Sequence, residues 1–171
     1  SFDGSSRYRA TITVIAGLAE GEAATGTVAR LIVCGIREDG PALGLEAARL
    51  AVAWGDRGVV GYDIAGAEVG CPAADFAEAY AVAGEAGLGR TVHAGESSGP
   101  EGVRDAIELL GADRIDHGVR AIEDPGVVAL LVDRRIALGV CPTSNLKLGV
   151  VPAIEQHPIE RLRHAGVAVS V

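Results

Sequence analysis

Short apolar runs alternate with longer amphipathic segments along most of the chain. The runs are rich in β-branched and aliphatic residues and end near glycine or small residues, which is typical of strands. We predict six strands, at residues 28–34, 59–64, 90–93, 114–117, 136–141 and 167–171. The segments between them have a helical spacing of apolar positions, and we predict helices at residues 11–24, 43–54, 74–86, 102–110, 125–134 and 154–165. Residues 1–10 show neither pattern, and we interpret them as a loop or a damaged strand.

This alternation of strands and helices predicts an α/β fold built from parallel βαβ units. The strands are apolar throughout, as expected when both faces of a sheet are covered. A doubly wound nucleotide-binding sheet would need a glycine-rich phosphate loop, and the sequence contains none. Polar residues instead follow several different strands, which is the arrangement of a barrel. We therefore predict an incomplete (β/α)8 TIM barrel, with about six of the eight strands present in one partial domain over residues 1–171.

Composition narrows the class of protein. A chain of 171 residues with 49% hydrophobic content can bury a core, and a net charge of −8 argues against a nucleic-acid partner. No apolar run is long enough for a membrane span, and no signal peptide begins the chain. Three widely spaced cysteines fit a reducing compartment, so we expect a cytoplasmic protein with no membrane partner. The chain contains no methionine, and we expect Ser1 to be a cut end of a longer protein.

Two strand ends carry the candidate chemistry. Residues 91–96 read Thr-Val-His-Ala-Gly-Glu, and residues 114–118 read Arg-Ile-Asp-His-Gly. Because parallel strands end at one rim of a barrel, His93, Glu96 and His117 can converge on one pocket. His93 is a suitable zinc ligand, and Gly95 can take the backbone angle that turns Glu96 inward.

The other histidines and Asp116 divide into one catalytic candidate and three residues without a catalytic role. His117 could accept a proton from a metal-bound water, whereas we interpret Asp116 as a strand-end carboxylate tied to a loop amide. His157 and His164 have no convergent partners in the sequence, and we predict that both lie on the surface.

Four stretches in register resemble motifs of the adenosine deaminase family, the zinc-dependent purine aminohydrolases, and this resemblance implies a TIM barrel of the metal-dependent hydrolase type. They are residues 61–68 (GYDIAGAE), 91–96 (TVHAGE), 114–118 (RIDHG) and 140–145 (VCPTSN). The resemblance implies that His93 is a zinc ligand and that Glu96 protonates a ring nitrogen of the purine. It also implies that His117 orients and deprotonates the zinc-bound water.

The other motif residues have lesser roles in that resemblance. It implies that the backbone amide of Gly66 hydrogen-bonds a second ring nitrogen. Ser144 and Asn145 then shape the loop beyond Cys141 without acting in catalysis. The reaction would be hydrolytic deamination, with zinc as cofactor and a small purine nucleoside as substrate.

Two elements of the family pattern are missing. The sequence contains no His-x-His pair, and it ends at Val171 before an acidic pair could follow the last strand. A catalytic zinc site normally has three protein ligands, and only His93 is identifiable here. We therefore expect the chain on its own to bind zinc weakly and to be inactive, while the parent protein deaminates adenosine to inosine and ammonia.

Several alternatives remain open. The substrate could be adenine or a modified adenosine, and the chain could be a non-catalytic, degenerate paralogue. An amidohydrolase with a carbamoylated lysine is disfavoured because Lys147, the only lysine, lies beyond a strand end. A cytidine-deaminase type of zinc site needs a Pro-Cys-x-x-Cys motif, which is absent. The sequence leaves the oligomeric state open.

Overall fold

The computed structural model describes the backbone from residue 4 to residue 171 and the side chains from residue 13. Its strands are β1 (Leu31–Ile36), β2 (Val59–Ala65), β3 (Gly89–Ala94), β4 (Arg114–His117), β5 (Ala137–Gly139) and β6 (Val169–Ser170). Its helices are α1 (Gly4–Thr25), α2 (Pro41–Ala53), α3 (Ala77–Glu85), α4 (Pro100–Glu108), α5 (Pro125–Arg134), α6 (Pro142–Lys147) and α7 (Ile159–His164). Short 3-10 helices are η1 (Arg37–Asp39), η2 (Gly55–Arg57), η3 (Ala73–Phe76), η4 (Val119–Glu123) and η5 (Ile154–Gln156).

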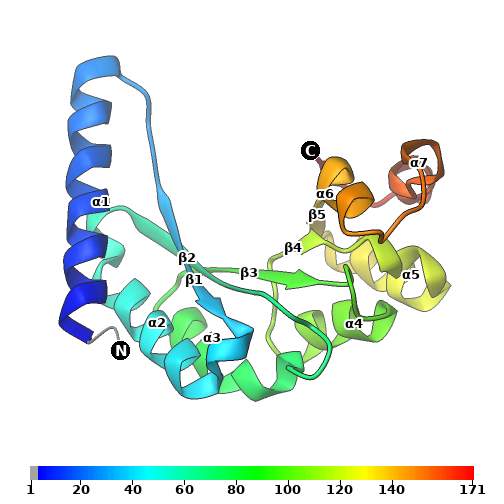
Figure 1. Cartoon of the computed structure of the whole chain (residues 1–171), viewed down its shortest axis with the longest axis horizontal. Helices are drawn as coiled ribbons and strands as arrows, with labels where there is room; N and C mark the ends of the chain where they lie inside the picture. The colour runs from blue at the N-terminus through cyan, green and yellow to red at the C-terminus, as the bar shows by residue number, and fades with distance from the viewer. Residues whose placement is uncertain (1–3) are drawn as a thin grey trace.

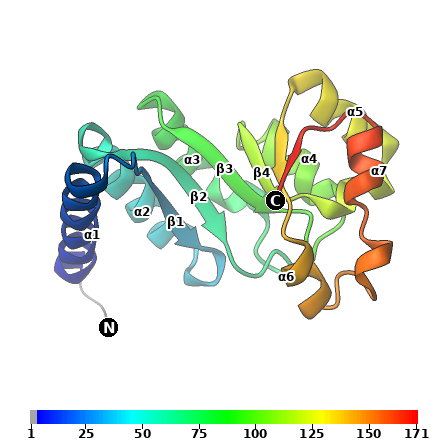
Figure 2. The same ribbon diagram turned by 90° about the horizontal axis from the view of Figure 1, so that it is seen from above.

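The six strands form one parallel sheet in chain order, β1 to β6. The sheet is curved and open, and helices α2 to α5 lie along one side of it (Figures 1 and 2). Parallel strands in sequential order, each joined to the next through helical segments, make up part of a (β/α) barrel. The predicted fold class, an incomplete barrel with six strands, is therefore confirmed.

The core lies between the sheet and these helices. Tyr62 and Ile64 on β2, Val92 on β3 and Ile115 on β4 are completely buried. Tyr62 packs edge-on against Tyr80 of α3, with ring centroids 5.1 Å apart. Each such side chain contributes roughly 1.5–3 kcal/mol on burial. This packing holds strands β2, β3 and β4 together, and these strands carry the candidate site.

The observed elements correct three expectations. Helix α1 begins at Gly4, so the prediction of a loop or strand was wrong for residues 4–10. Residues 5–10 contain neither proline nor glycine, so the helix continues through them. Residues 1–3 lie outside the described part. The predicted helix 154–165 is split into η5 and α7, because Pro158 lacks an amide hydrogen and restricts the residue before it. The short helix α6 was not predicted from the sequence.

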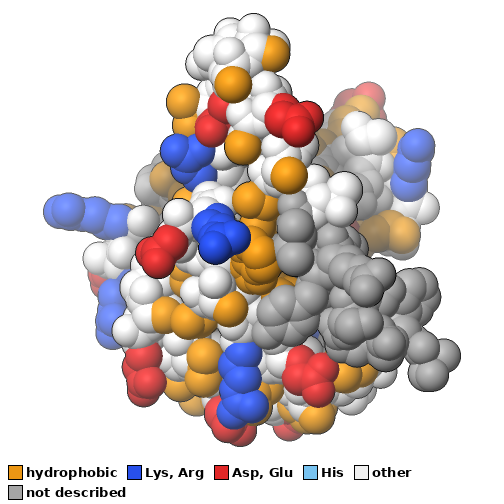
Figure 3. Space-filling model, turned by 90° about the vertical axis from the view of Figure 1, so that its left-hand side faces the viewer, with side chains coloured by type: hydrophobic (Ala, Val, Ile, Leu, Met, Phe, Trp, Pro, Cys, Tyr) orange, Lys and Arg blue, Asp and Glu red, His pale blue; other side chains and the backbone are white. Residues whose placement is uncertain are grey.

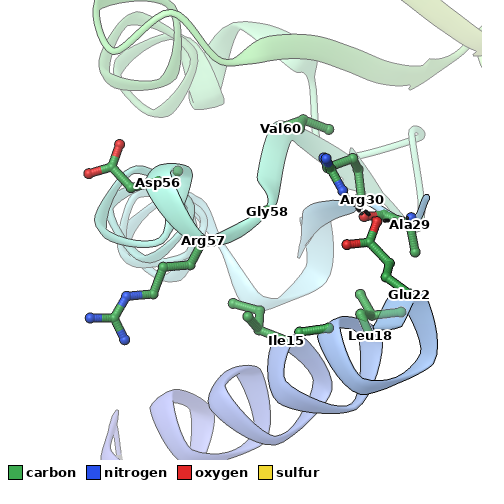
Figure 4. Close-up of a pocket in the computed structure, with 11 residues that line it drawn as sticks. Ile15, Leu18, Glu22, Ala29, Arg30, Asp56, Arg57, Gly58 and Val60 are labelled. Carbon is green, nitrogen blue, oxygen red and sulfur yellow. Dashed lines mark hydrogen bonds and ion pairs between the residues drawn. The ribbon is translucent and has the colours of Figure 1, made fainter. Parts of the chain in front are cut away.

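Helix α1 stands at one end of the molecule, beside the amino ends of β1 and β2 (Figure 1). Apolar side chains lie among charged ones on this face (Figure 3). A cavity of about 320 Å³ separates α1 from the strands, and Ile15 and Leu18 point into this space (Figure 4). Glu22 and Arg30 form an ion pair of 2.7 Å at its edge. Within residues 4–171, no helix has the length and apolar character needed to cross a membrane.

Candidate metal centre and proton-transfer site

Three adjacent strands bring acidic and imidazole groups together near their carboxyl ends. Asp63 lies on β2, His93 on β3 and Asp116 on β4, and His93 is paired with Asp116 in the register of the sheet. One possible ligand atom from each residue lies within 4.8 Å of the others. Nδ1 of His93 is 2.8 Å from Oδ2 of Asp63 and 3.9 Å from Oδ2 of Asp116. The fold thus assembles a compact group of two carboxylates and one imidazole.

Two atoms of this group are buried without a hydrogen bond among the described residues. They are Oδ1 of Asp63 and Nδ1 of His93. Nδ1 of His93 nevertheless lies 2.8 Å from Oδ2 of Asp63, so these two side chains are paired, and Oδ1 of Asp63 is the atom without a partner among the described residues. Buried polar atoms in folded proteins nearly always have partners, so atoms left without one mark a place where another group binds.

A divalent cation such as zinc fits this group. Imidazole nitrogens and carboxylate oxygens are both zinc ligands. A carboxylate beside one ring nitrogen commonly orients an imidazole whose other nitrogen holds the metal, and Asp63 lies in that position beside Nδ1 of His93. The sequence identified only His93 as a zinc ligand, and the structure places the carboxylates of Asp63 and Asp116 beside it as further candidates. The interpretation of Asp116 was wrong: among the described residues it contacts the Arg114 side chain, at 3.3 Å, and the His93 ring.

A second group lies beside the first. Oε1 of Glu96 is 3.0 Å from Nδ1 of His117, and the Asn145 amide donates a hydrogen bond of 3.0 Å to the same oxygen. The rings of His93 and His117 have centroids 5.4 Å apart. The structure therefore brings His93, Glu96 and His117 into one site, as the positions of the strand ends predicted.

The backbone at both strand ends is held in an unusual conformation. Gly95 has a φ of 68°, and a Cβ at this position would collide with Val103. His117 has a φ of 66°, which is rare for a residue with a side chain. Such a conformation persists only where the surroundings enforce it, and it is common at functional sites. The amides of Gly118 and Arg120 enforce it here by donating to the carbonyls of Ala94 and Gly95, at 2.9 and 3.0 Å.

Glu68 anchors the loop that carries Glu96. Its carboxylate accepts hydrogen bonds from the backbone amides of Gly95, Glu96 and Ser97, at 2.7, 2.9 and 2.8 Å, and from the Ser98 hydroxyl. Burial alone would raise the pKa of Glu68, but these donors outweigh it and hold the pKa below the ordinary value of 4.5. Glu68 belongs to the motif at residues 61–68, yet the sequence showed no reason for its presence.

The two imidazoles have different affinities for a proton. Burial would lower the pKa of His93, but the Asp63 carboxylate outweighs it and raises that pKa. For His117, burial dominates over the nearby Glu96 carboxylate and the pKa is lowered. The neutral ring of His117 is therefore able to accept a proton.

Several residues near the site were not singled out in the sequence. The Cys34 thiol lies 3.6 Å from Oδ2 of Asp63, and burial together with that carboxylate raises the pKa of the thiol to about 12, so it stays protonated. The buried Arg37 donates to the carbonyls of His93 and Cys71, at 2.8 and 2.7 Å. No local motif marks Arg37, because its partners lie 34 and 56 residues away.

The remaining candidates divide into three outcomes. His157 is 8% exposed and is hydrogen-bonded to Asn145, so the prediction of a surface position was wrong, whereas His164 is exposed as predicted.

Gly66 has a φ of 101°, and the Glu38 carboxylate occupies the space that a Cβ would need. This geometry explains why glycine stands there, while the substrate contact of its amide stays a prediction.

Comparisons with known proteins agree with the motifs. The family model described as "Adenosine deaminase" matches residues 7–171. A protein named adenine deaminase from Agrobacterium fabrum is 44% identical over 161 residues, which are 92% of this chain and 50% of that protein. The chain thus spans about half the length of the curated relatives it matches.

Solved structures give the same result. The adenine deaminase of Arthrobacter aurescens matches with a TM-score of 0.83 and 36% identity, over 90% of this chain and 47% of that one. A Burkholderia ambifaria amidohydrolase with bound Zn matches with a TM-score of 0.85 and 28% identity, over 94% and 45%. An Arabidopsis N6-mAMP deaminase matches with a TM-score of 0.73 and 26% identity, over 82% and 41%.

Proposed function

Because the chain belongs to the adenosine deaminase family, we propose that the whole protein removes the amino group of an adenine-type purine by hydrolysis, with zinc as its cofactor. The observation that carries this proposal is the convergence of His93, Asp63 and Asp116 with Glu96 and His117 near the ends of three strands. A metal-binding group beside a donor and an acceptor of protons is what hydrolysis of a carbon–nitrogen bond requires.

The metal-binding residues have distinct tasks in this proposal. His93 holds the zinc, Asp63 fixes the orientation of its ring, and Asp116 adds negative charge to the site. Zinc, when bound, lowers the pKa of water toward neutrality and so supplies a nucleophile. The raised pKa of His93 in the chain alone means that zinc has to compete with a proton for this ring.

Glu96 and His117 handle the protons. Glu96, in its protonated form, donates to a ring nitrogen of the purine next to the carbon under attack, which makes that carbon more electrophilic. His117 accepts a proton from the attacking water, and its lowered pKa keeps the ring neutral and able to do so. Addition of water and loss of the amino group convert the amino-purine to the oxo-purine and release ammonia.

We propose adenine as the substrate, in preference to adenosine. The relative from Agrobacterium fabrum and the solved protein from Arthrobacter aurescens are both named adenine deaminases. These names favour the alternative stated from the sequence over the nucleoside. The Arabidopsis neighbour, named for N6-mAMP, supports the broader class of adenine-type substrates. The amide of Gly66 would donate to a purine ring nitrogen in each case.

A chimeric enzyme tests the proposal. In it, this chain replaces the matching 161-residue half of the Agrobacterium fabrum protein. We expect the chimera to bind zinc and to release ammonia from adenine faster than from adenosine or AMP. The E96Q chimera is the matched control and should release ammonia at least about 100-fold more slowly. A folded, zinc-loaded chimera without activity on any of the three would overturn the proposal. The chain alone is assayed in parallel, and we expect it to be inactive.

A further inference from the structure

Asn145 lies at the centre of a buried hydrogen-bond network that joins the site to the far end of the chain. Its side chain is completely buried. Its amide nitrogen lies 3.0 Å from Oε1 of Glu96 and 3.2 Å from Nδ1 of His117. Its carbonyl oxygen lies 3.1 Å from Nε2 of His157. A carboxamide can be turned by half a rotation with little change of shape, so something has to specify which end faces Glu96.

His157 supplies that specification. The backbone N–H of Ile159 donates to Nδ1 of His157 at 3.2 Å. A backbone amide can only donate, so Nδ1 has to be the acceptor and the ring proton has to be on Nε2. Nε2 then donates to Oδ1, the side-chain oxygen of Asn145. Each end of the imidazole therefore has one defined role.

We propose that His157 is a positioning residue that fixes the Asn145 amide so that its N–H group holds the Glu96 carboxyl in place. This rests on the proposed function, in which Glu96 donates the proton to the purine. The reversed carboxamide would place its oxygen against Oε1 of Glu96, where two acceptors repel each other, and would leave the His157 N–H facing another donor. The correct amide orientation is thus linked to one tautomer of a residue outside the site.

The surroundings keep this link in place. Burial lowers the pKa of His157, so the ring stays neutral, with Nδ1 free to accept. Pro158 restricts the backbone between the imidazole and Ile159. The backbone amides of Val150 and Val151 donate to the backbone carbonyl of Asn145 at 2.9 and 3.3 Å, which fixes the backbone from which the carboxamide projects.

Nuclear magnetic resonance of the chain labelled with 15N-histidine tests the tautomer directly. The chain contains four histidines, so each ring can be assigned by substitution. We expect His157 to be neutral with its proton on Nε2. We also expect H157L to move the His117 ring signals, H157Q, which keeps a donor for Asn145, to restore them, and H164Q to leave them unchanged. A His157 proton on Nδ1, or a folded H157L chain with unchanged His117 signals, would overturn the proposal.

Kinetics of the chimera provide the second test. We expect H157L to lower kcat roughly 10- to 100-fold with little change in KM, because the proton donor loses its alignment while purine binding is kept. H157Q should recover most of kcat, and H164Q should match the unmodified chimera. Equal kcat values in H157L and the unmodified chimera would contradict the role of His157. An inactive chimera would count against the proposed function alone, since the tautomer measurement does not depend on turnover.

Discussion

Strand β3 carries charged groups at both of its ends, and the two ends differ in how completely those groups are satisfied. At the amino end, Asp113 accepts hydrogen bonds from the backbone amide, Nε and Nη2 of Arg90, at 2.8, 3.3 and 3.1 Å. At the carboxyl end, His93 is paired with Asp63, yet Oδ1 of Asp63 is buried without a hydrogen bond among the described residues. One end has satisfied its polar groups and the other has not.

This difference separates stability from chemistry within one strand. The hydrogen-bonded pair of Arg90 and Asp113 is open to solvent, and it serves to join β3 to the loop before β4. A buried group with unmatched atoms costs free energy that only a bound partner recovers. In barrels the amino ends of the strands serve stability and the carboxyl ends carry the active site, and the two ends of β3 follow that division.

Among substitutions at the two ends of β3, loss of Glu96 beyond the carboxyl end should have the largest effect, and this effect is on turnover. We expect E96Q to lower kcat of the chimera about 100- to 10,000-fold, the usual contribution of a positioned proton donor. The melting temperature should change little, because the neutral amide can keep its contact with Asn145. The measurement is ammonia release under saturating adenine, and near-normal turnover would remove Glu96 from the mechanism.

Loss of Asp63 should weaken metal binding. We expect D63N to reduce the zinc affinity of the chain about 10- to 100-fold, because the His93 ring loses the carboxylate that orients it. Competition with a coloured chelator measures this affinity. D113N, at the other end of β3, is the matched control and should leave it unchanged. Equal zinc affinities of D63N and D113N would show that Asp63 does not act on the metal.

Replacement of Glu68 should affect stability and its dependence on pH. We expect E68Q to destabilise the chain by about 2 kcal/mol, since the amide of glutamine lacks the charge and one of the two acceptor oxygens that bind three backbone amides. The folded pKa of Glu68 lies below its ordinary value of 4.5, so its stabilisation is fully present above pH 4.5 and is lost as the pH falls through the folded pKa. Urea unfolding at several pH values measures both effects.

The test of Glu68 is whether the stabilities of the unmodified chain and of E68Q become equal in acid. The difference in stability between the unmodified chain and E68Q should shrink as the pH falls below 4.5. A difference that stays constant over that range would mean that the Glu68 charge does not hold the loop.

The smallest effect is expected at the satisfied end of β3. Asp113 has 54% of its side chain exposed, so its ion pair with Arg90 is screened by solvent. We expect D113N to cost less than about 1 kcal/mol of stability, to lose part of that effect in high salt, and to leave adenine turnover of the chimera unchanged. A D113N chimera with strongly reduced turnover would contradict the division between the two ends.

Local patterns were sufficient for the framework and for part of the site. The strand predicted at residues 114–117 is β4 with its observed bounds, and the six strands were all found in the sheet. His93, Glu96 and His117 were identified because each stands at or just beyond a strand end, and parallel strands end at one rim. Asp63 was not visible in this way, because it occupies a position in the apolar run of β2 where the sequence predicts only a buried strand.

What the sequence determined by itself was the order of strands, helices and strand-end polar residues, because these follow from short-range periodicity. Tertiary structure alone decided which distant groups meet. Asn145 donates a hydrogen bond to Glu96, which lies 49 residues away in the sequence. His157, which the sequence predicted to lie on the surface, is hydrogen-bonded to Asn145. Strand register placed Asp116 beside His93. Hydrogen bonds and ion pairs depend on ångström-scale positions, which periodicity does not specify and which only the packed sheet and its loops provide.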